Sequence, residues 1–280
     1  AFTAFSPQVI FHSSHVSNDI LATAFSTAAL WQLARIVRFG GSRRRGCALG
    51  LALGLAALVK VHTLLIGLPI ALGFGWLLLR RGEATEWSER FREVWVTASG
   101  AMLGFMAVAG WWFVRGWLRY GSLLGLDTHC YQELSTCGPF RLVWPNRFAW
   151  RDTFRSFWAA FGLANIRPYD WVYWIFAGLV IMAQARKAAA SDPTNLPTDP
   201  HLPILLFLLG SAVAGNVFLL YIWMQQILAT YGRLLYPSLG AIVVLFIAGL
   251  WELRPRLARS AWVIPATLAV LAPFWLIRPA

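Results

Sequence analysis

Long apolar stretches, separated by short groups of charged residues, run along this chain of 280 residues. A helix that crosses a bilayer needs about 20 mostly apolar residues at a rise of about 1.5 Å each. The stretches lie at roughly 20–38, 46–59, 63–79, 95–114, 171–185, 203–222, 235–251 and 260–276. No alternation with a period of two, as in barrel strands, competes with this pattern. The pattern predicts an all-α, polytopic transmembrane helix bundle with about eight membrane segments.

One apolar stretch, 46–79, is too long for a single span and too short for two full ones. Lys60 and His62 interrupt it near the middle, so it predicts a tight hairpin of two short helices. Arginine placement gives an independent test, because loops rich in Lys and Arg stay in the cytoplasm. The basic clusters are Arg35, Arg38 and Arg43 to Arg45, then Arg80, Arg81, Arg90 and Arg92, then Arg186 and Lys187, then Arg254, Arg256 and Arg259. With the hairpin in place, alternation of the spans puts all four clusters on one side and Lys60 on the outside.

The composition agrees with this interpretation and excludes two other classes of protein. Hydrophobic residues make up 58% of the chain and charged residues 13%, which is too apolar for a soluble domain. The net charge of +12 comes from arginines beside the spans, and no nucleic-acid-binding motif accompanies it. We therefore expect an integral membrane protein with no nucleic acid partner. The chain starts at Ala1 inside an apolar segment, so we also expect an N-terminally truncated fragment of a longer protein.

Two segments are expected to lie outside the membrane in what is otherwise a single transmembrane domain over residues 1–280. Residues 188–203 contain the run SDPTNLPTDPHLP and predict a cytoplasmic linker. Residues 116–170 are the one long outer loop, rich in aromatic side chains, and form a candidate lid over an outer site. Within this loop, 152–161 has apolar residues at helical spacing and predicts a short helix lying in the membrane interface.

Three charged residues at the predicted outer ends of spans are candidates for binding a substrate or its phosphate. Asp19 lies at the start of the first span, where capping of the helix by Asn18 or Asp19 is the simpler explanation. Lys60 occupies the tip of the hairpin, where a lysine either extends to the water interface or has a partner or a function. Arg233 lies in the run YGRLLYP, and arginine pairs with phosphate oxygens through a rigid fork. Together these residues predict a site on the outer face.

Five further residues that could bind substrate or form a disulfide are expected on the outer side. His15, His62 and Arg115 are secondary candidates for substrate binding. The outer histidines match no closed four-ligand spacing, so we predict no metal site and no cofactor, with a divalent metal left open. Cys130 and Cys137 both lie in the outer loop, where the compartment permits disulfides, and we expect them to be bonded.

Four segments, taken together and in order, resemble conserved stretches of the GT-C type membrane glycosyltransferases. They are residues 7–19 (PQVIFHSSHVSND), 49–60 (LGLALGLAALVK), 111–121 (WWFVRGWLRYG) and 231–237 (YGRLLYP). The resemblance points to a bacterial DUF2142-like branch, related to protein mannosyltransferases and aminoarabinose transferases. It implies a polyprenyl-phosphate-sugar donor lipid, an envelope glycan, lipid or protein acceptor, and a location in the bacterial inner membrane.

The resemblance also implies roles for individual residues. Asp19 and Lys60 match the family's outer-face acid and lysine, which pair with each other, and Arg233 matches the arginine of its Gly-Arg-x-x-x-Pro motif. The family's catalytic carboxylate lies in a first outer loop that would precede Ala1, so the catalytic base is expected outside this chain. No metal is required where lysine and arginine stabilise the departing phosphate.

Two other functions compete with a sugar transferase. In a transporter or flippase, Asp19 and Lys60 would be coupling or substrate groups, but such proteins usually show internal repeats and the sequence shows none. A non-catalytic membrane assembly subunit is the third hypothesis, because the expected catalytic carboxylate is not in residues 1–280. An outer-loop acid upstream of Ala1 would favour the enzyme.

Overall fold

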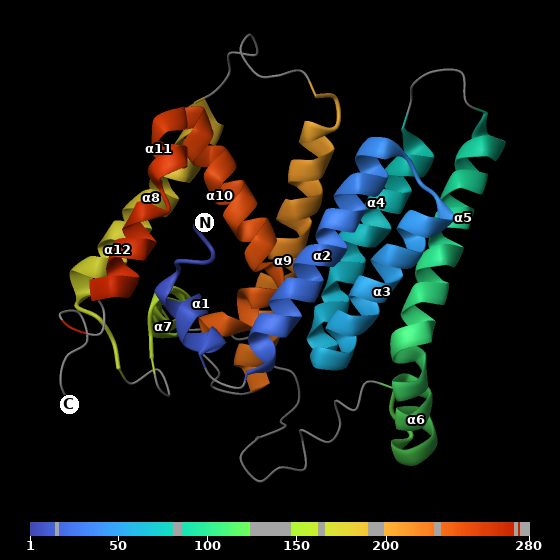
Figure 1. Cartoon of the computed structure of the whole chain (residues 1–280), viewed down its shortest axis with the longest axis horizontal. Helices are drawn as coiled ribbons and strands as arrows, with labels where there is room; N and C mark the ends of the chain where they lie inside the picture. Colours follow the sequence, from blue (N-terminus) through green and yellow to red (C-terminus); the bar gives the residue numbers. More distant parts are fainter. Residues whose placement is uncertain are drawn as a thin grey trace.

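The computed structural model describes residues 1–14, 17–80, 86–123, 147–161, 166–189, 199–226, 231–271 and 274. The elements are α1 (Pro7–Ser13), α2 (Asn18–Phe39), α3 (Arg43–Val59), η1 (Val61–Ile66), α4 (Gly67–Leu79), α5 (Trp87–Phe105), η2 (Met106–Gly110), α6 (Trp111–Tyr120), α7 (Arg147–Trp158), α8 (Asp170–Ala189), α9 (Leu202–Gln226), η5 (Gly232–Ser238), α10 (Leu239–Leu253), α11 (Pro255–Ser260) and α12 (Val263–Leu271) (Figure 1). Within the described residues, the one pairing of extended backbone is an isolated bridge between Phe161 and Ile166. The predicted all-α class is confirmed.

Helices occupy the predicted apolar stretches, but their lengths are less uniform than the sequence suggests. Among the described residues, five helices are long and apolar enough to cross a membrane: Asn18–Phe39, Val61–Leu79, Trp87–Tyr120, Leu202–Met224 and Gly232–Leu253. α3 is shorter, with 17 residues, and α8 contributes only the apolar part Asp170–Met182. The molecule is therefore a membrane helix bundle in which shorter helices pack among full-length spans.

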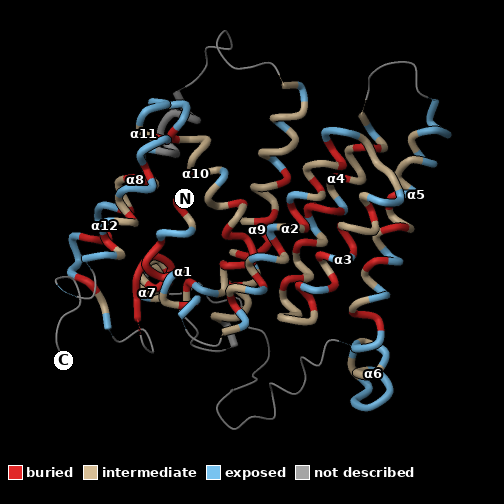
Figure 2. Tube along the Cα trace, in the orientation of Figure 1, coloured by how far each residue is buried: buried red, intermediate tan, exposed pale blue. Residues whose placement is uncertain are grey.

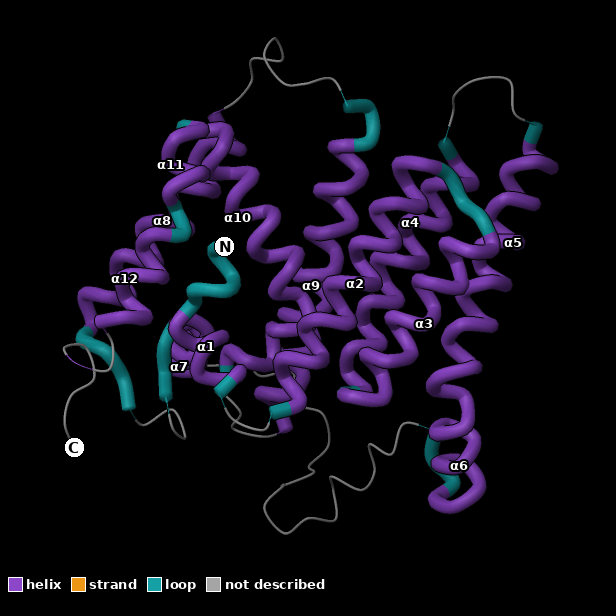
Figure 3. Tube along the Cα trace, viewed as in Figure 1, coloured by secondary structure: helices purple, strands orange, loops and turns teal. Residues whose placement is uncertain are grey.

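The stretch 46–79 forms the predicted hairpin. α3 ends at Val59, Lys60 adopts an extended backbone conformation, and η1 and α4 return as one continuous helical segment (Figure 3). The Lys60 N–H donates to the Ala56 carbonyl at 2.9 Å, and the Thr63 N–H donates to the Lys60 carbonyl at 3.0 Å. Because both backbone groups of Lys60 are bonded, the turn holds its side chain at the end of the hairpin.

Glycines allow α3 and α5 to approach each other closely. A Cβ added to Gly50 of α3 would lie 1.9 Å from the Ala101 carbonyl oxygen, and one added to Gly104 of α5 would lie 2.3 Å from that of Cys47. Side chains do not come that near to backbone atoms, so only glycine fits at these positions. Small residues spaced four apart commonly bring membrane helices together in this way. Sequence analysis did not identify this contact.

The helices alternate in direction, which gives the bundle two distinct ends (Figure 1). The turn from α2 to α3, the end of α4, the start of α5 and α11 lie at the upper end in Figure 1 and carry arginines of the clusters. The start of α2, the end of α3, α6, α7 and the start of α10 lie at the lower end, which we call the Lys60 end. This arrangement matches the alternation inferred from the arginines. Which end faces the cytoplasm stays a prediction.

α7 is longer and more buried than the interfacial helix predicted at 152–161. It packs against η5, α1 and α8, and its last residues, Phe157 and Trp158, are buried. Trp158 stacks on Phe176 of α8 with ring centroids 4.3 Å apart. Figure 2 shows buried residues at the end of α7, whereas much of α6 is exposed. The apolar face of α7 therefore contacts the protein core, and its place in the membrane interface stays a prediction.

Candidate functional site

The first turn of α2 places Asp19 inside the bundle. Ser17 precedes the helix in an extended conformation, and its hydroxyl accepts a hydrogen bond from the Asp19 N–H at 3.2 Å. The same hydroxyl donates to Asp19 Oδ2 at 3.1 Å. Ser17 is thus the helix cap, which corrects the expectation that Asn18 or Asp19 caps the helix. The Asp19 carboxylate is left to bind another group, although only 3% of the residue is exposed.

Lys60 supplies the partner of this carboxylate. Its Nζ forms an ion pair with Asp19 Oδ1, and 18% of the lysine side chain and 4% of the aspartate side chain are exposed. The two residues are therefore paired as the GT-C resemblance implies, whereas their role in binding stays a prediction. Desolvation makes a buried ion pair unfavourable unless further hydrogen bonds compensate for it. Ser17 provides one such bond to the carboxylate.

Arg233 adds a second positive charge to the pair. Its guanidinium interacts electrostatically with the Asp19 carboxylate and lies 5.0 Å from the centre of the Tyr231 ring. The residue is exposed, and no carboxylate in the described part of the chain forms an ion pair with it. One buried carboxylate thus interacts with two cations. The cluster of Asp19, Lys60 and Arg233 carries excess positive charge, which suits an anionic ligand such as a phosphate.

The backbone around Arg233 is fixed by its neighbours in η5. Gly232 lies so close to α7 that an added Cβ would be 2.3 Å from the Phe157 nitrogen, which explains the glycine of this motif. Tyr236 is fully buried, and its ring meets the ring of His12 edge-on at a centroid distance of 5.6 Å. Because both contacts are made by buried groups, η5 is a rigid support for the exposed Arg233 side chain.

Two of the secondary candidates occupy different parts of the Lys60 end. His62 interacts electrostatically with both Lys60 and Asp19, so it belongs to the surroundings of the pair. Arg115 lies on α6, where its guanidinium is 5.4 Å from the centre of the Trp112 ring. Figure 1 places α6 at the edge of the bundle, on the far side of α3 from α7. The structure therefore brings His62, but not Arg115, to the cluster.

The remaining predictions about the outer side fall largely outside the described residues. His15, Cys130 and Cys137 are not among them, so the role of His15 and the disulfide stay predictions. Within the described residues, no three His, Cys, Asp or Glu side chains lie together as metal ligands would. The structure thus offers no metal centre there on which to build a mechanism.

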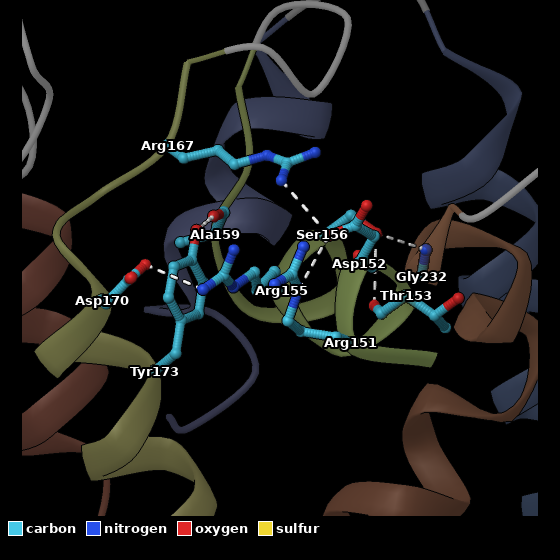
Figure 4. Close-up of polar contacts among 10 residues, drawn as sticks. All are labelled: Arg151, Asp152, Thr153, Arg155, Ser156, Ala159, Arg167, Asp170, Tyr173 and Gly232. Carbon is cyan, nitrogen blue, oxygen red and sulfur yellow. Dashed lines mark hydrogen bonds and ion pairs between the residues drawn. The ribbon is translucent and has the colours of Figure 1, made fainter. Parts of the chain in front are cut away.

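A second charged group, which sequence analysis missed, joins α7 to α8 (Figure 4). Arg155 donates to Asp170 Oδ1 at 2.9 Å, and its guanidinium lies 5.4 Å from the centre of the Tyr173 ring. Arg167 donates to Asp152 Oδ1 at 3.3 Å. The partners in each pair are 15 positions apart, a spacing that matches no helical or strand period and gave no signal in the sequence. These pairs hold α7 in place at the Lys60 end.

The bundle holds an apolar cavity of about 130 Å³. Its walls come from the first residues of the chain and from α7, α8, α9, η5 and α10. Tyr236 is part of the wall, and the same residue interacts electrostatically with Asp19. Tyr236 is therefore the residue that links the cavity to the cluster.

Residues 1–112 match the family model described as dolichyl-phosphate-mannose-protein mannosyltransferase. No curated protein and no solved structure matches the chain. The matched residues include Asp19 and Lys60, whereas Arg233 lies beyond them. Protein mannosyltransferases are GT-C enzymes, so the resemblance to that superfamily is confirmed, while the DUF2142-like branch gains no support. Through residues 1–112, the chain resembles the protein mannosyltransferase family of the GT-C type membrane glycosyltransferases.

Proposed function

We propose that this protein transfers a sugar from a polyprenyl-phosphate-linked donor to a cell-envelope acceptor at the outer face of the membrane. The observation that carries the proposal is that two cations, Lys60 and Arg233, both interact with the one Asp19 carboxylate, which leaves the cluster with a net positive charge. The matched family supports it, because its description names a dolichyl-phosphate-linked mannose and a protein. For this chain we propose the same broad classes, a lipid-phosphate-linked sugar and an envelope glycan, lipid or protein.

The reaction needs positive charge where the phosphate of the donor departs. When the bond between sugar and phosphate breaks, negative charge develops on the phosphate oxygens, and cations already in place stabilise it. Arg233 is exposed, so the N–H groups of its planar guanidinium can donate to those oxygens. Lys60 is held by Asp19, and its ammonium has three donors, so donors are left for a phosphate oxygen. Asp19 is already bound by Lys60 and by the Ser17 hydroxyl, so we assign no proton transfer to it.

The apolar cavity supports a lipid-linked donor over a soluble one. Its volume, about 130 Å³, is similar to that of an apolar cavity that stays dry and binds benzene, so it accommodates a short length of hydrocarbon. We propose that a donor with its phosphate at Lys60 and Arg233 directs the first part of its chain toward this cavity, because Tyr236 lines the cavity and interacts electrostatically with Asp19. A ligand with a charged head and an apolar chain fits this arrangement.

The arginine clusters support the outer face as the side of the reaction. They gather at the end of the bundle opposite Lys60 (Figure 1), and loops rich in arginine stay in the cytoplasm. A bacterial inner membrane, with an envelope acceptor outside it, completes the proposal.

The proposal is tested by the release of polyprenyl phosphate from polyprenyl-phosphate mannose by the full-length protein in proteoliposomes, with cell-envelope extract added as the acceptor of the mannose. Lys60→Ala or Arg233→Ala should lower the rate by about 100-fold, as the loss of one preorganised donor does in other enzymes. Arg119→Ala is the matched control, because Arg119 is an exposed arginine of α6 at the same end, and it should keep the wild-type rate. Wild-type rates in both the Lys60 and the Arg233 variants would overturn the proposal.

A further inference from the structure

A hydrogen bond joins α7 to the residue before Arg233. The Gly232 N–H donates to Ser156 Oγ at 2.7 Å, and both residues are buried (Figure 4). The Ser156 hydroxyl donates in turn to a carbonyl of its own helix, that of Asp152 at 2.7 Å or that of Thr153 at 3.2 Å. One serine hydroxyl therefore links the backbone of α7 to the backbone of η5, 76 positions away.

The two backbones are in direct contact around this bond. A Cβ at Gly232 would lie 2.3 Å from the Phe157 nitrogen and 2.4 Å from the Thr153 carbonyl oxygen. One turn later in η5, the Tyr236 ring meets the Phe157 ring edge-on, with centroids 6.0 Å apart. η5 thus contacts α7 at Gly232 and at Tyr236, and Arg233 lies between these two residues in the sequence.

α7 is itself anchored to the core. The Gln8 side chain of α1 binds both backbone groups of Ala160 just beyond the helix: its Nε2 donates to the carbonyl at 2.8 Å, and its Oε1 accepts from the N–H at 2.6 Å. The Tyr173 hydroxyl of α8 donates to the Ala159 carbonyl at 2.5 Å. The position of α7 is therefore fixed from two sides, which makes it a firm support for η5.

We propose that Ser156 is a positioning residue for Arg233: its hydroxyl holds the Gly232 backbone so that the Arg233 guanidinium keeps its place in the cluster with Asp19 and Lys60. The proposal rests on the proposed function, because it takes Arg233 to bind a lipid phosphate. Ser156 acts through Gly232 and does not touch the substrate. Without the hydroxyl, the buried Gly232 N–H loses its partner, and η5 moves to satisfy it. A small displacement of a binding group is enough to weaken a site that depends on orientation.

A purely structural role for Ser156 has a different consequence. It would lower the stability of the whole bundle, and any loss of affinity would be added to the loss caused by removing Arg233. If Ser156 positions Arg233, Ser156→Ala should cause no further loss of affinity in a protein that already carries Arg233→Ala, because the two residues act in one interaction. A double-mutant cycle on affinity separates the two roles.

The experiment measures binding of polyprenyl phosphate to the full-length protein in nanodiscs for the wild type, Ser156→Ala, Arg233→Ala and the double variant. We expect Ser156→Ala to bind about tenfold more weakly, as the loss of one hydrogen bond predicts, and the double variant to bind like Arg233→Ala. Hydrogen exchange of the peptide that contains Gly232 should be faster in Ser156→Ala. Ser99→Ala is the control, because the exposed Ser99 hydroxyl donates to the Val96 carbonyl of its own helix at 3.0 Å, and it should change neither result.

The outcomes separate this inference from the function on which it rests. If Arg233→Ala weakens binding but Ser156→Ala does not, or if the two losses add, Ser156 does not position Arg233 and the proposed function stands. If Arg233→Ala binds polyprenyl phosphate as the wild type does, both proposals fail. Should Ser156→Ala not fold, Ser156→Cys, which keeps a weaker acceptor, enters the same cycle with the same expected and contradicting results.

Discussion

Lys60 Nζ binds Asp19 Oδ1 across 41 positions of sequence and ties the end of α3 to the start of α2. Both charges are largely buried, and Ser17 donates a hydrogen bond to Oδ2, the other oxygen of the carboxylate. The pair is thus a contact between two helices and also a fixed support for the lysine ammonium. Removing one charge leaves the other buried without its partner, whereas removing both does not.

Lys60→Met should destabilise the protein by about 3 kcal/mol, because it leaves the buried Asp19 carboxylate without its ion-pair partner. The double variant Asp19→Asn with Lys60→Met removes both charges and should recover most of that loss. Thermal unfolding in detergent micelles measures both variants. A double variant no more stable than Lys60→Met would show that the two charges do not compensate each other.

Gly50→Ala should destabilise the contact between α3 and α5. The new Cβ would lie 1.9 Å from the Ala101 carbonyl oxygen, so the helices must separate, at a cost of about 2 kcal/mol. Gly75→Ala is the matched control in α4, because no described atom beyond the neighbouring backbone of its own helix lies within 4 Å of its Cβ position. Alanine favours a helix over glycine by about 1 kcal/mol, so the control should be neutral or stabilising. Equal unfolding temperatures for the two variants would argue against the close approach.

Gln8→Ala should loosen α7 from α1. It leaves the Ala160 N–H and carbonyl without the amide that binds both, and a buried group without a partner costs about 2 kcal/mol. Thermal unfolding measures the loss, and hydrogen exchange at Ala160 should become faster. Ser13→Ala, on the exposed side of the same helix, is the control. If both variants unfold at the wild-type temperature, the Gln8 contact does not anchor α7.

Cysteine labelling tests the sidedness of the bundle. In a variant without the three native cysteines, Arg119→Cys and Lys60→Cys should react with a membrane-impermeant maleimide added outside intact cells. Arg44→Cys, in an arginine cluster at the opposite end, should react only after permeabilisation. The reverse pattern would place the Lys60 end in the cytoplasm and remove the support for an outer-face reaction.

The helices and the hairpin could be predicted because they depend on the lengths of apolar stretches and on the positions of arginines, both of which are visible in short segments of the sequence. The extended conformation at Lys60 follows from the charge that interrupts the 46–79 stretch, and the structure shows the expected reversal there. The pairing of Asp19 with Lys60 was implied by family resemblance, and it agrees with the positions of both residues at the same end of neighbouring helices.

The contacts that fix the site could not be predicted, because they join backbone groups far apart in the sequence. The Ser156 bond to Gly232 spans 76 positions, and the Gln8 bonds to Ala160 span 152. A serine within a helix or a glutamine in an apolar segment carries no signal of such a partner. Capping by Ser17 was missed for a different reason, since Ser17, Asn18 and Asp19 all have cap-forming side chains and their conformation decides among them.

Binding of a lipid phosphate at the cluster of Asp19, Lys60 and Arg233 is tested most directly by comparing polyprenyl phosphate with uncharged polyprenol as ligands of the full-length protein in nanodiscs. We expect the wild type and Arg119→Ala to bind the phosphate more tightly than the alcohol, by about 100-fold if one charge-assisted interaction of about 3 kcal/mol is decisive. Arg233→Ala should lose most of that preference. Equal affinity of the wild type for the two lipids, or an unchanged preference in Arg233→Ala, would contradict phosphate binding at this cluster.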